Sequence, residues 1–405
     1  MARALKVMSA VLLVSLAACS SLKDDNAPPD GLDCTKTVNG GGDSQTLATA
    51  LAGAPLGSCV VVVSQTYTGN FVVPAGVTLV SAQGSRAKFS STDASAPAIT
   101  LQGGLGSAIQ GLDITAAADV GIAVRGGPAR LSDVSVTGAK SAAVGALCSD
   151  DTCHDGAHSL TLDDVHLVGN DTGLWTSGED VTMTGGEASR NTSKGLTGGN
   201  GVVALAGAHV TLDGTAVSNN DQIGILFDGK GGTTGDLKSV TVDANGGRGV
   251  WAQGLVGTVD SPALTIEGAS ALTNNKIVGL GAVSSHGIIF VGGKIQNSVA
   301  APIVTDLGST EQVGDGFGFF GQTGDVKMDT VDVSGNSRAA GLIDNPTNVI
   351  IFVGGKVDPG ASGLKIVVQN VAAQATAPQI SSDATSTSTE LGFSAPSVSV
   401  GAPLR

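Results

Sequence analysis

Three acidic residues follow short alternating runs of the chain and could carry acid–base chemistry. Asp213, Asp243 and Glu267 each come directly after the apolar residue that ends such a run. Hydrolysis of a glycosidic bond needs two carboxylates about 5–9.5 Å apart, and neighbouring strands lie about 4.8 Å apart. On consecutive layers of a stacked repeat, the three residues would form an acid pair or an oxygen-rich site for Ca²⁺. The same predicted column contains Asp163, Thr184 and Asp329.

A competing interpretation of this column is structural, and we favour it. Short acidic side chains at strand ends commonly hydrogen-bond the backbone of the following turn. Basic residues that would receive the carboxylates of an acidic substrate are also sparse near the column. The column therefore gives weak catalytic candidates, and a bound Ca²⁺ has no further support.

The two tryptophans of the chain are candidates for a binding surface. Trp175 and Trp251 each stand two residues after a recurring glycine, and Val203 and Leu226 occupy the same place in the repeats between them. Alternation along a strand directs all four side chains outward. Exposed apolar strips with aromatic ends mark surfaces that bind sugars or protein partners. The alternative is that a loop, for example 229–235, covers the strip.

Two other groups of residues contain side chains that occur in binding sites. Asp150, Asp151, His154, Asp155 and His158 crowd one loop, but their spacing matches no metal motif, and we predict a solvated polar loop without a metal. The glycine-rich turn 229–232 lacks the Ser or Thr and the strand–helix context of a phosphate-binding loop.

A repeat explains how these residues are positioned. A glycine, once replaced by alanine, is followed by an apolar residue that alternation places inside the molecule. A second repeat, 288–294, recurs unchanged as 350–356, which indicates a duplication of two layers. Short β-branched runs separated by Gly and Asn turns indicate an all-β solenoid, in which each repeat buries its apolar face against its neighbours. The recurring positions are Gly121, Ala143, Gly173, Gly201, Gly224, Gly249, Gly279, Gly316 and Gly341.

Composition limits the classes of partner. The 405 residues include 60 glycines and carry a formal net charge of −14. No basic cluster is present, which argues against binding to nucleic acid. The negative charge also disfavours electrostatic docking on anionic lipid.

The N-terminal part of the repeat resembles a known family. Asp43 and Ser44 can cap a short helix that runs through Ala52, and apolar strands 59–63, 71–73 and 77–80 follow. This order resembles the start of the pectin-lyase-like, right-handed parallel β-helix family. The resemblance implies a single-stranded right-handed parallel β-helix of about eleven or twelve coils over residues 36–371. The helix would plug its N-terminal end, and residues 372–405 would form a C-terminal cap or loose tail.

The resemblance does not extend to catalytic residues. Several members of the family cut acidic polysaccharides, but the arginine-bearing signature of pectate lyases is absent from this chain. Ser285-His286-Gly287 is only faintly similar to the Gly-His-Gly of polygalacturonases, and no Asn-Thr-Asp motif precedes it. No catalytic residue can therefore be carried over.

The first residues resemble the signal peptide of bacterial lipoproteins. Arg3 and Lys6 precede an apolar run that is too short to span a membrane as a helix. The run ends in Leu16-Ala17-Ala18-Cys19, which is similar to a lipobox. The resemblance implies that residues 1–18 are removed, that Cys19 is acylated, and that residues 19–35 tether the domain. Ser20 favours sorting to the outer membrane. The alternative is an ordinary signal peptide with an incidental cysteine.

Four further cysteines suggest disulfide bonds in an exported protein. Cys148 and Cys153 lie five residues apart and are expected to pair across one loop, which leaves Cys34 to pair with Cys59. Four cysteines allow three connectivities, and this one is a preference.

These features predict a monomeric lipoprotein of the bacterial cell envelope whose β-helix binds a glycan or a protein partner without catalysis. A divergent polysaccharide lyase or glycoside hydrolase is the first alternative. A purely structural envelope protein is the second.

Overall fold

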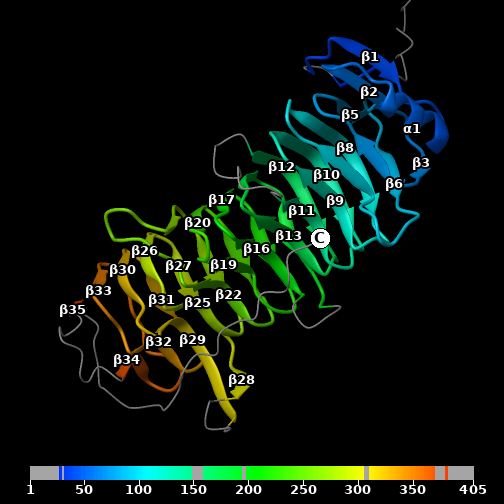
Figure 1. The fold of residues 1–405 in the computed structure, drawn as a ribbon. Coiled ribbons are helices and arrows are strands. Elements are labelled where there is room, and N and C mark those ends of the chain that lie inside the picture. Colours follow the sequence, from blue (N-terminus) through cyan, green and yellow to red (C-terminus); the bar gives the residue numbers. More distant parts are fainter. Residues whose placement is uncertain are drawn as a thin grey trace, which may run out of the picture.

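The protein, examined as a computed structural model, is a right-handed parallel β-helix drawn out along one axis (Figure 1). The structure describes residues 27–29, 32–147, 158–193, 198–304, 310–369 and 379–381. Within these residues there is one α-helix, and the strands form two long sheets. We call the 22-stranded sheet A and the 13-stranded sheet B. The all-β solenoid predicted from the repeat is confirmed.

Sheet B supplies one strand to each coil and has twelve parallel members, which agrees with the eleven or twelve coils expected. The short strand β28 (Ala301–Val304) adds to it by antiparallel pairing with β29. The parallel members are β4 (Phe71–Val73), β7 (Ile99–Gln102), β9 (Val120–Arg125), β11 (Ala142–Leu147), β13 (Thr172–Ser177), β16 (Asn200–Leu205), β19 (Ile225–Asp228), β22 (Arg248–Gln253), β25 (Ile277–Val283), β29 (Thr310–Phe320), β32 (Ala339–Asp344) and β34 (Leu364–Gln369).

Sheet A forms the remainder of each coil and is bent along its length. Its strands are β1 (Lys36–Asn39), β2 (Ser58–Val62), β3 (Thr66–Thr68), β5 (Thr78–Ser81), β6 (Ala87–Ser90), β8 (Ser107–Thr115), β10 (Ala129–Thr137), β12 (Ser159–Val168), β14 (Asp180–Thr184), β15 (Glu187–Ser189), β17 (His209–Asp213), β18 (Ala216–Ser218), β20 (Thr234–Lys238), β21 (Thr241–Asp243), β23 (Leu264–Glu267), β24 (Ala271–Thr273), β26 (His286–Val291), β27 (Lys294–Gln296), β30 (Gly324–Asp329), β31 (Asp332–Ser334), β33 (Val349–Val353) and β35 (Gln379–Ser381).

A left-handed residue makes the bend in sheet A. In the long strands β8, β10 and β12 this residue is Gly111, Asp133 or Asp164, with φ of 69°, 51° and 51°. In later coils the strand is interrupted at the corresponding place, so that β14 and β15, or β17 and β18, take the two sides of the bend. Each coil therefore has three faces, two from sheet A and one from sheet B.

Stacked asparagines build the corner between sheet A and sheet B. Asn191, Asn220, Asn245 and Asn275 are buried, and each asparagine accepts hydrogen bonds from the backbone and the side chain of the one before it. The side-chain bonds measure 2.8, 2.9 and 2.8 Å from donor to acceptor. Because the corner is closed to water, these amides satisfy turn groups that would otherwise be buried without partners. Asn170 extends the ladder by one coil.

The interior of the coils is an aliphatic stack. The residue that follows each recurring glycine is fully buried and pairs in register with its counterparts in sheet B from Ile122 to Phe317. The duplicated segments also occupy equivalent places, since Ile288 of β26 and Ile350 of β33 both pair with Val326 of β30. The predicted inside–outside phase and the two-coil duplication are confirmed over this part of the chain.

The phase changes by one residue at the eleventh strand of sheet B. Phe317 pairs with Gly341 and not with Leu342, so the prediction that Leu342 points inward is wrong. The physical reason is the size of the phenyl ring. A Cβ on Gly341 would lie 2.0 Å from Cζ of Phe317, so a residue without a side chain makes space for the ring. Leu342 is buried on the outer side of the sheet instead.

The N-terminal end is closed as the resemblance implied. Helix α1 (Ser44–Ala52) begins after Asp43, whose carboxylate accepts the backbone N–H of Thr46, and its Leu47 and Leu51 are buried in the core. Cys34 and Cys59 form a disulfide bond. Cys148 and Cys153, with the loop between them, lie outside the described residues, as does Cys19.

At the other end, β35 adds a strand to sheet A within the region predicted to be a cap or tail. No helix in the described part of the chain is long and apolar enough to cross a membrane.

Candidate functional site

The four residues of the predicted apolar strip lie side by side on the outer face of sheet B. Trp175 of β13 pairs with Val203 of β16, which pairs with Leu226 of β19, which pairs with Trp251 of β22. Their exposed fractions, however, are only 5%, 1%, 2% and 1%. The prediction that these side chains are exposed is therefore wrong, although their register and their outward direction are right.

These side chains belong to a second apolar cluster that is separate from the interior core. We call it the outer cluster, and it runs along sheet B from β11 to β34. Its buried members are Ala142, Trp175, Val203, Leu205, Ile223, Leu226, Trp251, Val278, Ile303, Val313, Phe320, Ala339, Leu342 and Val367. In the outer cluster the indole of Trp251 lies over Gly281, and a Cβ added to Gly281 would come within 2.3 Å of the indole ring. The ring centroids of Trp251 and Phe320 are 6.3 Å apart.

A cation lies at the edge of the outer cluster. The guanidinium carbon of Arg248 is 4.3 Å from the ring centroid of Trp251, which is a cation–π contact. Its Nε is buried and has no hydrogen-bond partner. Burial lowers the pKa of Arg248 to about 10. The side chain is therefore held against the indole at an electrostatic cost.

The glycine-rich loop 229–235 does not cover the strip. Gly231 lies against Ala206 and Gly207 of the preceding turn, and Gly229 lies against Gly254 of the following one. The loop thus stacks with the turns at the edge of sheet B, in line with the other coils.

The acidic column predicted from spacing does not form on consecutive coils. Asp213 pairs with Lys238, and Lys238 pairs with Glu267, so a lysine stands between the two acids. Asp243 lies beyond the bend, where it pairs with Ser218 and accepts hydrogen bonds from Thr273 and Asn274. The reason is that each coil has two strands in sheet A, and spacing alone assigned Asp243 to the wrong one.

No group of three or more His, Cys, Asp or Glu side chains that could hold a metal ion occurs among the described residues. Of the polar loop considered above, 150–155 lies outside them. His158, which is described, accepts the backbone N–H of Gly127 at 3.1 Å through Nδ1.

Another polar cluster on sheet A combines acidic and basic side chains. Glu187 lies 3.3 Å from His166 and 3.7 Å from Arg190, and His166 also lies 3.4 Å from Asp164. Burial would raise the pKa of Glu187, but hydrogen bonds from Ser189 and His166 and the charge of Arg190 hold it below its ordinary value. A general acid needs a raised pKa, so Glu187 is suited to remain ionised and not to donate a proton.

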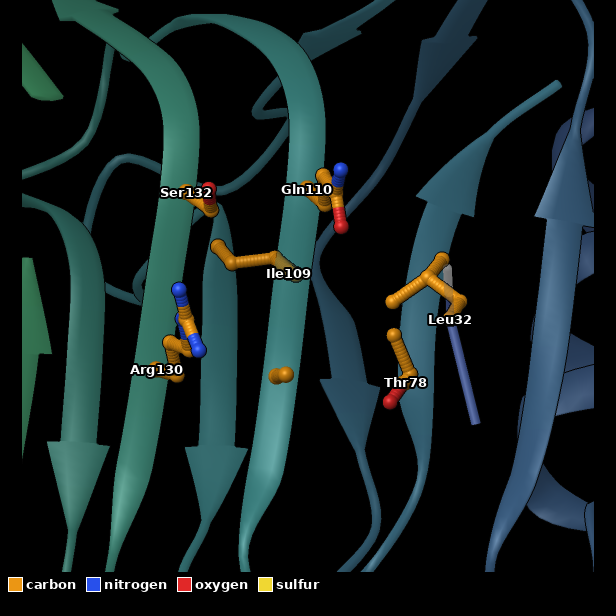
Figure 2. A pocket seen from close by; sticks show the side chains of 7 residues that line it. Leu32, Thr78, Ile109, Gln110, Arg130 and Ser132 are labelled. Carbon is orange, nitrogen blue, oxygen red and sulfur yellow. The ribbon is translucent and has the colours of Figure 1, made fainter. Parts of the chain in front are cut away.

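A hollow of about 250 Å³ opens on the outer face of sheet A near its N-terminal end. Figure 2 shows Arg130 and Ser132 on β10, Gln110 on β8, and Thr78 on β5 around it, with Leu32 at one side. Ala108 and Ile109 of β8 complete the lining. The hollow exists because the outward residues between its rims are small. Sequence reasoning missed it, since it depends on which residues three coils place side by side.

The disulfide bond positions one wall of this hollow. Leu32 and Cys34 pack on a small apolar cluster formed by Cys59, Val61, Val80 and Ala82 on the outer side of sheet A. The bond from Cys34 to Cys59 ties this leading segment to β2. Leu32 therefore ends the covered part of the face, and the hollow begins beside it.

Ion pairs fix the opposite rim. Nη2 of Arg130 is 2.6 Å from a carboxylate oxygen of Asp163, while 60% of the Arg130 side chain remains exposed. Nearby, Arg86 contacts Asp113 and Asp133 at 2.5 Å each. Burial alone would lower the pKa of Arg86, but the hydrogen bonds and charges of the two carboxylates raise it above its ordinary value.

Polar rows continue from the hollow along the axis. Arg130 pairs with Thr161, Thr161 with Thr182, and Thr182 with Thr211, so that these side chains form one row across four coils. They are exposed or half-buried. Strand spacing places a hydrogen-bonding group about every 4.8 Å along this row.

A second hollow, of about 210 Å³, lies on the outer face of sheet B. Ala123 and Gly145 contribute to its lining, with Asp119, Arg125 and Ser141 around them. Gly145 pairs with Trp175. The outer cluster therefore ends where this hollow begins.

Comparisons with known proteins agree with the fold. Residues 120–300 match the sequence model of the family described as right handed beta helix region. A comparison with curated protein sequences gives no match.

Several solved structures align with this chain at low identity. A double mutant of the periplasmic alginate epimerase AlgG aligns with a TM-score of 0.52 and 12% identity over 86% of this chain and 84% of that chain. Pectate lyase Pel9A aligns with a TM-score of 0.49 and 15% identity over 87% of this chain and 82% of that chain. The A-module of mannuronan C-5 epimerase AlgE4 from Azotobacter vinelandii aligns with a TM-score of 0.43 and 13% identity over 85% of this chain and 96% of that chain. At such identities the likeness extends to the fold alone.

Proposed function

We propose that this right-handed parallel β-helix binds a neutral, hydroxyl-rich polysaccharide along the outer face of sheet A, without catalysis. The observation that carries the proposal is the hollow beside Leu32, which opens onto the polar row that begins at Arg130. A linear polymer lying along the axis would enter the hollow with one unit and follow the row with the next ones.

The chemistry of the hollow suits a sugar ring. Gln110 offers an amide that both donates and accepts, and Ser132 and Thr78 offer hydroxyl groups that do the same. A sugar hydroxyl needs both functions. Leu32 provides an apolar wall for the C–H side of a ring. Binding sites of this kind combine apolar contact with a few placed polar groups.

The charge distribution favours a neutral polymer over an acidic one. The guanidinium of Arg130 is already paired with Asp163 at 2.6 Å, so little positive charge is free to attract a carboxylate. The whole chain carries a net charge of −14, which repels polyanions at long range. Related folds in enzymes that act on alginate or pectate suggest polysaccharides as a class, and the charges of this chain select among them.

The test is a glycan array probed with the chain lacking residues 1–18, followed by titration calorimetry with the polysaccharide that binds. Gln110→Ala should weaken binding by about 0.5–1.5 kcal/mol, because one or two hydrogen bonds between neutral groups are lost. Ser132→Phe should abolish binding, because the ring would fill the hollow. Thr241→Phe on β21 is the matched control, since this exposed threonine lies beyond the bend.

Two results would contradict the proposal. One is an array without any polysaccharide signal. The other is a signal that Ser132→Phe leaves unchanged. A reducing-end release assay on the bound polysaccharide tests the alternative of a divergent lyase or hydrolase, for which new chain ends would have to appear.

We also propose that the chain is held in the bacterial cell envelope by a lipid on Cys19. The support is the sequence Leu16-Ala17-Ala18-Cys19 after a basic and apolar leader. Cys19→Ser should move the protein from the membrane fraction to the soluble fraction, because a chain with a net charge of −14 has little affinity for anionic lipid. If the variant sediments with membranes as the native chain does, the anchor is elsewhere.

A further inference from the structure

Two rows of outward side chains pass through the hollow on sheet A, and both rows become covered on one side of it. In the second row Ser132 of β10 and Gln110 of β8 are half-buried, whereas Val80 of β5 and Val61 of β2 are both 0% exposed. The outer face of the sheet is therefore open at the hollow and closed directly beside it. In strand register the first row is Arg130, Ala108, Thr78, Cys59, and the second row is Ser132, Gln110, Val80, Val61.

The cover is the part of the chain that precedes β1. We call its described residues, 27–29 and 32–34, the leading segment. Leu32 of this segment packs against the apolar cluster that contains Val61 and Val80. The same side chain lines the hollow (Figure 2). The leading segment therefore occupies both rows at the point where the hollow ends.

Two links fasten the leading segment to the sheet. The disulfide bond joins Cys34 to Cys59 of β2. At the other end of the segment, the backbone N–H of Gln83, which follows β5, donates to the carbonyl of Ala27 at 2.9 Å. The two links lie on either side of Leu32 in the sequence. A bound polymer therefore meets a fixed wall at this side of the hollow.

On the other side of the hollow, both rows stay open. Every outward side chain of the two rows on β12, β14 and β17 is exposed or half-buried. These side chains carry hydroxyl or carboxylate groups, which form hydrogen bonds with the hydroxyl groups of a sugar. A polymer can thus continue from the hollow in this direction alone. The first row continues through Thr161, Thr182 and Thr211, and the second through Asp163, Thr184 and Asp213.

We propose that the hollow binds the end of a polysaccharide chain and not an internal stretch. This inference rests on the glycan binding proposed above and adds which part of the polymer is recognised. An internal stretch continues in both directions from any unit, and the leading segment blocks one of them. The terminal unit has no such continuation, so it fits against Leu32 while the following units lie along the rows beyond Arg130.

The test measures how many protein molecules bind to one polymer chain. Titration calorimetry is carried out with a short and a long fraction of the polysaccharide found on the array, both longer than the rows. Recognition of ends gives the same number of bound proteins per chain for both fractions. A number that rises in proportion to chain length would overturn this inference and leave the proposed function intact. An absence of binding to either fraction would refute the proposed function, and this inference with it.

A variant that releases the leading segment tests the cause of the effect. Leu32→Asp together with Cys34→Ala and Cys59→Ala removes the disulfide bond and places a charge on the apolar cluster, where it cannot remain. In this variant the number of bound proteins should become larger for the long fraction than for the short one. Asp43→Ala is the matched control, because it removes the helix cap at the same end of the β-helix and keeps the disulfide bond. Equal numbers for both fractions in the released variant would contradict the inference.

Discussion

The asparagine ladder allows a stability prediction that can be worked out bond by bond. Asn220 is 1% exposed, and its side chain takes part in four hydrogen bonds. Its Oδ1 accepts the backbone N–H and the Nδ2–H of Asn191, and its Nδ2 donates to Ala188 and to Asn245. Asn220→Ala removes all four bonds. Two donors of Asn191 and the carbonyl of Ala188 then lose these partners in a corner that is closed to water.

The expected cost is the sum of these losses. A buried donor without a partner costs about 1–3 kcal/mol, so two donors give about 2–6 kcal/mol. The bond lost to Asn245 adds little to this cost, because Oδ1 of Asn245 still accepts the backbone N–H of residue 220 at 3.1 Å. We therefore expect Asn220→Ala to lower the free energy of unfolding by about 4 kcal/mol. This is a large fraction of the stability of an ordinary domain.

The control is the preceding residue. Asn219 is exposed and has a φ of 56°, which glycine adopts without strain. Asn219→Gly should therefore change the stability by less than about 1 kcal/mol. Urea unfolding followed by circular dichroism measures the global effect. Hydrogen exchange of the amides of Asn191 and Asn220 measures the local one, because unfolding of a repeat protein need not be two-state.

A loss below about 1 kcal/mol in Asn220→Ala, with unchanged exchange at Asn191, would refute the reasoning. It would mean that the corner admits water to the freed groups. A loss equal to that of Asn219→Gly would have the same meaning.

Three further predictions concern single residues. Gly341→Leu should cost several kcal/mol in urea unfolding, because its side chain would overlap the ring of Phe317, and unchanged stability would mean that the ring has another position. Arg248→Met should keep or raise the melting temperature at pH 7, because the lowered pKa of Arg248, about 10, shows that charge is disfavoured in the folded state, and removing this cost outweighs the contact with Trp251. The charged arginine therefore lowers the stability of the folded state at every pH below about 10, and this loss disappears only as the pH rises from about 10 toward the ordinary pKa of arginine. A lower melting temperature in the variant at pH 7 would contradict the interpretation. Asp43→Ala should lower the melting temperature at pH 7 but not at pH 2, because hydrogen bonds from Thr46 lower the pKa of Asp43, and the stability from this cap is lost as the pH falls through that lowered value. An equal effect at both pH values would show that the charge of Asp43 is not involved.

The alternation and the recurring glycine were sufficient to predict the architecture, because both are local properties of the chain. Period-2 alternation states which side of a strand is buried, and a repeat that cannot bury its own face has to stack. The inward position of Ile225 and the outward direction of Leu226 follow from this. The cap at Asp43 and the helix that ends at Ala52 follow from equally local chemistry. The pairing of Cys34 with Cys59 was only the preferred one of three connectivities, and the disulfide bond between them agrees with that preference.

The tertiary structure alone decided which residues become neighbours and which are covered. Coils differ in length, so spacing in the sequence does not give the register. Asp243 therefore lies on a different strand from Asp213, and Gly341 shifts the phase against Phe317. Exposure is also not local. The strip at Trp251 points outward, as alternation requires, yet it is buried, because burial depends on what lies over a face and not on where a side chain points.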